Sequence, residues 1–148
     1  MLKAQIEADL KAAMLGGEKK RVEVLRGLKS AILYEEVAQN ARETGLSDDA
    51  ILKVIARESK KRAEASELYK KSGSAERADA ELLEKKIIDV YLPSQLSDDE
   101  LGKIIEEVIA NLGKNAQMGA VIGAVRAKVG VAADGSRIAA TVQGRLRG

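Results

Sequence analysis

Two short runs hold the densest acidic side chains of the chain, and each run directly follows a serine. Asp48 and Asp49 follow Ser47, while the run 98–100, Asp-Asp-Glu, follows Ser97. Carboxylates can bind Mg²⁺ or Ca²⁺. A serine followed by acids is also typical of the first turn of a helix, where the dipole favours negative charge. Because adjacent residues on a helix point in different directions, we interpret both runs as helix starts and predict no metal site.

Two glycines, Gly119 and Gly123, stand four residues apart in an otherwise apolar run. The run lacks the lysine–serine ending of a phosphate loop and the preceding strand of a dinucleotide fingerprint, so it predicts no nucleotide site. In a helix over about 117–129 the two glycines share one face, at a cost of roughly 1 kcal/mol each relative to alanine. This cost suggests close approach of another backbone. Packing against a neighbouring helix and contact with a large partner both stay open.

The composition excludes several kinds of chemistry. The chain of 148 residues has no cysteine and no histidine, which removes disulfides, thiolate catalysis, Cys/His zinc sites and histidine acid–base catalysis. We therefore predict no catalytic residue, no cofactor and no metal ligand. No apolar stretch approaches the roughly 20 residues of a membrane span. The first ten residues include Glu7 and Asp9 where a signal peptide would have an apolar run, so we expect a cytoplasmic protein without a membrane partner.

Basic residues are unevenly distributed. Residues 116–148 contain five basic side chains against one acidic, whereas the other 115 residues contain 20 against 22. The basic run at 57–62 is interrupted by acids and is typical of a solvated helix face. The better candidates for phosphate contacts are Arg126, Lys128 and Arg137, close to the glycines. This segment has no aromatic residue, so an RNA contact there would read backbone and shape, not stacked bases.

Apolar residues recur at helical spacing along most of the chain, and Pro93 is the single proline. We predict an all-α fold with two parts. The first, residues 1–93, is a four-helix domain with helices at about 2–15, 18–41, 48–72 and 75–91, the last two forming a long antiparallel hairpin. The second, residues 94–148, is a three-helix tail domain with helices at about 98–112, 117–129 and from 135. Ser97 and Glu100 form a predicted capping box.

Three segments carry a resemblance to a known family. They are the run 91–97, Tyr-Leu-Pro-Ser-Gln-Leu-Ser; the run 118–125, Met-Gly-Ala-Val-Ile-Gly-Ala-Val; and the run 133–135, Ala-Asp-Gly. In this order and spacing the chain resembles the YqeY family, which is similar to the C-terminal part of the B subunit of the tRNA-dependent amidotransferase. The resemblance spans nearly the whole chain and also includes the run 21–32.

The resemblance implies a helical domain followed by a small tail that helps to hold tRNA, with the chemistry performed elsewhere. We therefore predict a free-standing tRNA-binding or tRNA-positioning module without catalysis of its own. Its binding residues are predicted to be Gly119, Gly123, Arg126, Lys128 and Arg137. One alternative is a protein–protein adaptor that uses the glycine-bearing face. A second is an accessory role in carbon–nitrogen ligation with glutamine as amido donor, a label that the resemblance brings with it.

Overall fold

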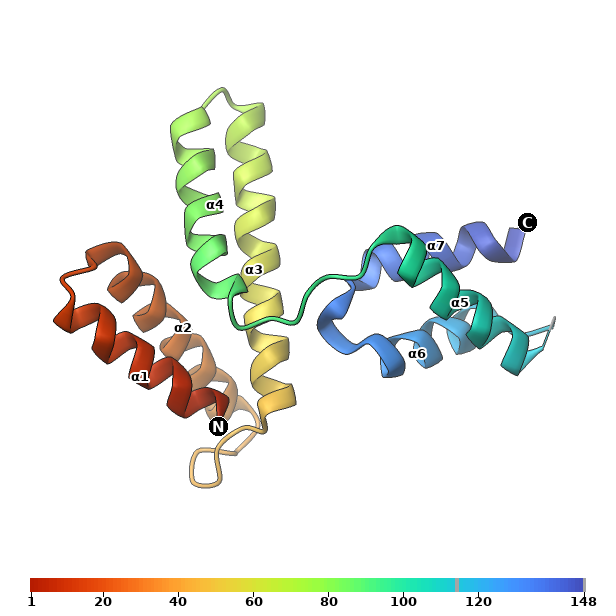
Figure 1. Cartoon of the computed structure of the whole chain (residues 1–148), viewed down its shortest axis with the longest axis horizontal. Helices are drawn as coiled ribbons and strands as arrows, with labels where there is room; N and C mark the ends of the chain where they lie inside the picture. The colour runs from red at the N-terminus through yellow and green to blue at the C-terminus, as the bar shows by residue number, and fades with distance from the viewer. Residues whose placement is uncertain (114, 148) are drawn as a thin grey trace. The chain divides into compact units, whose positions relative to one another are not determined.

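A computed structural model describes residues 1–113 and 115–147. In these residues the chain forms seven α-helices and a short 3₁₀-helix, η1, without any strand, which confirms the predicted all-α class. The backbone divides into two compact units, Met1–Leu92 and Pro93–Gly148. The helices of the first unit, coloured red to green in Figure 1, are α1 (Leu2–Leu15), α2 (Lys19–Ala38), α3 (Asp48–Lys71) and α4 (Ala75–Asp89).

Aliphatic side chains form the core of the first unit. The helices α1 and α2, the first half of α3 and the end of α4 supply it: Ile6, Leu10, Val24, Leu25, Leu28, Ile32, Ile51, Val54, Ile55 and Ile88, together with Tyr91. Each large aliphatic side chain that is fully buried contributes about 1.5–3 kcal/mol to folding. The first half of α3 contributes Ile51, Val54 and Ile55 to this core, so this part of the helix is apolar on its buried side.

The helices α3 and α4 run side by side as a long hairpin (Figure 1). In its outer part the contact is made by small residues. Ser66 is 1% exposed, and its hydroxyl donates a hydrogen bond of 3.1 Å to the carbonyl oxygen of Ala78. Since small side chains let the two backbones approach closely, the hairpin needs no broad apolar stripe beyond the core.

The second unit contains α5 (Asp98–Leu112), α6 (Met118–Val129), η1 (Gly130–Ala132) and α7 (Gly135–Arg147). Its core is entirely aliphatic: Leu101, Ile105, Val108, Val121, Val125, Val129, Ala133, Ile138 and Val142. The predicted capping box is present, because Ser97 Oγ accepts from the Glu100 N–H at 3.1 Å and Glu100 Oε1 accepts from the Ser97 N–H at 3.2 Å. The interactions of the Glu100 carboxylate with the Ser97 side chain, the largest cause, and with the Ser97 N–H lower the pKa of Glu100.

The segment that opens the second unit is bonded to η1. The Leu96 N–H donates to the carbonyl oxygen of Ala132 at 2.8 Å, and the Gln95 side-chain amide donates to that of Val131 at 3.0 Å. Sequence periodicity did not predict η1, since a single 3₁₀ turn leaves no periodic pattern. Its position matters because it reverses the chain between α6 and α7.

Candidate functional site

One aspartate of each acidic run binds a group in the first turn of another helix. Asp48 Oδ1 accepts a hydrogen bond of 3.1 Å from the Leu2 N–H and lies 3.6 Å from the N-terminal ammonium. Asp98 Oδ1 accepts one of 2.9 Å from Arg137. Within residues 1–113 and 115–147 there is no group of three or more side chains that could hold a metal ion. None of the helices described there is long and apolar enough to cross a membrane.

Cations of the run 57–62 take part in ion pairs. Arg57 Nη2 lies 3.0 Å from Glu35 Oε2, and Arg62 Nε lies 3.6 Å from Glu84 Oε2. Glu84 also accepts a hydrogen bond of 2.9 Å from Lys20, which raises the pKa of that lysine. These contacts connect helices of the first unit, so the side chains concerned act in the fold.

The two glycines of α6 lie on its exposed face. A Cβ atom added at Gly119 or at Gly123 would meet no atom within 4 Å. The buried side of α6 is formed instead by Val121, Val125 and Val129. The reading in which these glycines pack against a neighbouring helix is therefore wrong. They leave a stretch of helix backbone that is not covered by side chains.

Of the two basic residues of α6, Arg126 lies beside the glycines, whereas Lys128 lies on the far edge of the exposed side. At 3.6 residues per turn, Arg126 and Lys128 project from opposite edges of the exposed side of α6. Lys128 lies on the α5 side, where its Nζ is 3.7 Å from Glu107 Oε1. Arg126 lies on the α7 side, with its guanidinium 3.9 Å from a Cβ built at Gly135. Arg126 makes no ion pair with any residue that the structure describes, so it is available to an external anion.

Arg137 acts within the fold. Its Nη2 donates hydrogen bonds of 2.9 Å to the carbonyl oxygen of Leu96 and to Asp98 Oδ1. These bonds connect the first turn of α7 to the start of α5, across about 40 residues of sequence. Of the five predicted residues, Gly119, Gly123 and Arg126 thus share one side of α6. Lys128 projects on the α5 side, and Arg137 belongs to a separate contact.

Sequence reasoning overlooked two arginines of α7. Arg145 pairs with Glu106 of α5 and lies over Gly102, which is buried beneath it. Arg147 is exposed and has no ion pair among the described residues. A helical-wheel comparison with the buried Ile138 and Val142 could have placed Arg147 on the outer side.

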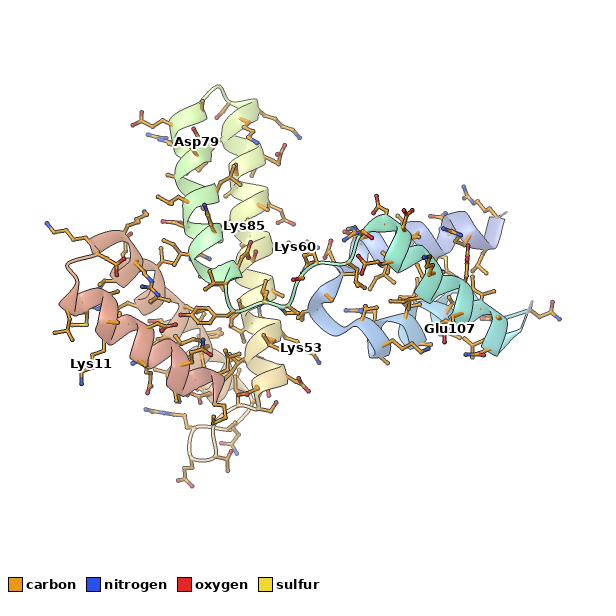
Figure 2. All side chains as sticks on the ribbon, viewed as in Figure 1. Lys11, Lys53, Lys60, Asp79, Lys85 and Glu107 are labelled. Atoms are coloured by element: carbon orange, nitrogen blue, oxygen red, sulfur yellow. The ribbon has the colours of Figure 1, made fainter. Side chains whose placement is uncertain are left out.

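In the second unit, most acidic residues lie on α5 and most basic residues lie on α6 and α7. Helices α6 and α7 contain five basic residues and no acidic residue, whereas α5 contains five acids and one lysine. The acids Asp98, Glu106 and Glu107 each meet one cation of α6 or α7. Figure 2 shows the side chains of this unit, with Glu107 labelled on α5. Among the described residues of α6 and α7, Arg126 and Arg147 are the cations without such a partner.

A family model matches most of the chain. A search of curated proteins finds no protein similar to the chain. The family model described as Yqey-like protein matches residues 3–146. The match covers both units, including the glycine face of α6 and Arg137 and Arg145 of α7, and it ends just before Arg147. The chain therefore belongs to the YqeY family.

Proposed function

We propose that the protein is a tRNA-binding or tRNA-positioning module without catalysis of its own. The observation that carries the proposal is the uncovered backbone of α6 at Gly119 and Gly123, with Arg126 on the same side of the helix. We call this surface, together with Arg147 of α7, the α6–α7 face. Its role in RNA binding is suggested by its chemistry and by the resemblance to an amidotransferase appendage.

The α6–α7 face suits a phosphate backbone better than exposed bases. Glycines let a large ligand approach the helix closely, and arginine guanidinium groups match the geometry of phosphate oxygens. The absence of acids on both helices avoids repulsion of the ligand. The tyrosines all precede residue 93, so the face offers no aromatic ring for base stacking. Recognition should therefore follow the shape of a folded RNA.

The test is retardation of labelled tRNA at low salt by the full chain. We expect Arg126→Gln and Arg147→Gln to weaken binding by about 5-fold each, which corresponds to about 1 kcal/mol per charge contact. Lys53→Gln is the matched control, because Lys53 is exposed on α3 of the first unit and loses the same charge. Equal weakening by the control, or no retardation by the wild-type chain, would refute the proposal.

A second candidate is a protein–protein adaptor that uses the same glycine face. The observation in its favour is again the exposed Gly119 and Gly123, joined on that face by Ala120 and Ala127, since small residues let a partner helix approach closely. Purification from native lysate after nuclease treatment separates the candidates. A protein partner that survives nuclease favours the adaptor, whereas loss of the bound material favours RNA.

A further inference from the structure

Not every cation of the second unit is equally available. Lys128 is 47% exposed and Arg145 is 42% exposed, so solvent reaches both. Each nevertheless has a carboxylate beside it. Lys128 Nζ lies 3.7 Å from Glu107 Oε1, and Arg145 bonds to Glu106. A phosphate that binds either cation must compete with the carboxylate already there.

The two acids are neighbours in sequence but serve opposite sides of α5. Glu107 faces the cation of α6, and Glu106 faces that of α7. Arg145 is held further by packing, because its guanidinium lies across Gly102, where any side chain would collide with it. A third pair, Asp98 with Arg137 at 2.9 Å, repeats the arrangement at the start of α5. The acids thus neutralise the cations along both flanks of α5.

We propose that Glu106 and Glu107 are specificity-determining residues that confine phosphate binding to the outer α6–α7 face. They occupy Lys128 and Arg145 and leave Arg126 and Arg147 for the ligand. The inference rests on the proposed function and adds to it which cations of α6 and α7 a phosphate can reach without competition. Phosphates that match the positions of Arg126 and Arg147, which have no ion pair among the described residues, are bound without displacing a carboxylate.

The test measures tRNA affinity of the full chain at several salt concentrations. Glu107→Gln keeps the size of the side chain and releases Lys128. We expect it to tighten binding by about 2- to 5-fold, the range of an exposed ion pair. It should also steepen the slope of log K against log salt by about 0.7–0.9, the contribution of one additional phosphate contact. Glu106→Gln should act likewise through Arg145.

The matched control is Asp99→Asn. Asp99 is exposed on the same helix and changes net charge equally, but it has no ion pair among the described residues. Its substitution should leave the salt slope unchanged. In a Lys128→Gln background, Glu107→Gln should lose its effect, which ties the gain to the released lysine. Circular dichroism verifies that each variant is folded.

The outcomes are distinguishable. If the wild-type chain binds tRNA but Glu107→Gln and Asp99→Asn have equal effects, the competition is refuted and the proposed function stands. If Glu107→Gln still tightens binding in the Lys128→Gln background, the competition is also refuted. If neither the wild type nor the variants bind tRNA at low salt, both the proposed function and the inference fall.

Discussion

Replacing Gly123 by alanine should stabilise the second unit and weaken its binding to tRNA. Gly123 lies in the interior of α6 with nothing within 4 Å of an added Cβ atom. A glycine in such a position costs roughly 1 kcal/mol relative to alanine, because its backbone loses more conformational freedom on folding. Since no atom has to move, the variant should gain nearly this whole amount.

Two other glycines of the second unit show what would make an alanine unfavourable. At Gly130 the φ angle is +55°, a backbone conformation that disfavours any side chain. At Gly102 a Cβ atom would meet the guanidinium of Arg145. Gly123 has neither obstacle. For a unit of about this size, a gain of roughly 1 kcal/mol raises the melting temperature by about 4–8 °C.

The assay can follow the two units separately. The three tyrosines, at positions 34, 69 and 91, all belong to the first unit. Tyrosine fluorescence therefore reports the unfolding of that unit, while far-ultraviolet circular dichroism reports both. We expect Gly123→Ala to raise the transition seen by circular dichroism alone. A loss of stability would show that Gly123 is packed, and unchanged affinity for tRNA would show that its backbone is not approached.

Three further substitutions test the contacts that hold each unit together. Ser97→Ala should lower the free energy of unfolding, measured in urea, by about 1 kcal/mol because it removes the helix cap. Since the folded-state pKa of Glu100 is lowered, the stability that Glu100 contributes should be present above pH 4.5 and lost as the pH falls through the lower folded-state value. Tyr91 donates a hydrogen bond of 2.6 Å to Asp9, and burial, the largest cause, raises the pKa of its hydroxyl. Unfolding monitored by circular dichroism should therefore show wild-type stability declining above pH 10, and Tyr91→Phe should reduce this decline. Gly130→Ala should cost about 1–3 kcal/mol by thermal unfolding, because its φ is positive.

Sequence reasoning succeeds here where a local signal decides the structure. The bounds of α1 and the serine caps of α3 and α5 follow from adjacent residues, and the structure has them as expected. The predicted end of α2 at residue 41 was wrong by three residues. The helix ends at Ala38, and Asn40 takes a φ of +53° while the Ala41 N–H bonds to the carbonyl oxygen of Glu36. Neither Asn40 nor Ala41 is a glycine, so the sequence carries no strong stop signal there.

The candidate site was less predictable because its pairing depends on distant residues. The count of five basic residues in the last 33 positions did not reveal that Arg137 and Arg145 each bond to an acid 39 residues earlier. Spacing placed Gly119 and Gly123 on one face, but it could not distinguish a packed face from an exposed one. Those distinctions depend on which helix lies opposite, which only the tertiary structure provides.

The salt dependence of tRNA binding by the wild-type chain tests the central claim most directly. If Arg126 and Arg147 each contact one phosphate, the slope of log K against log salt should be about −1.4 to −1.8. It should lose about 0.7–0.9 for each arginine replaced by glutamine. Binding that does not respond to salt, or a slope that both substitutions leave unchanged, would contradict RNA recognition by the α6–α7 face.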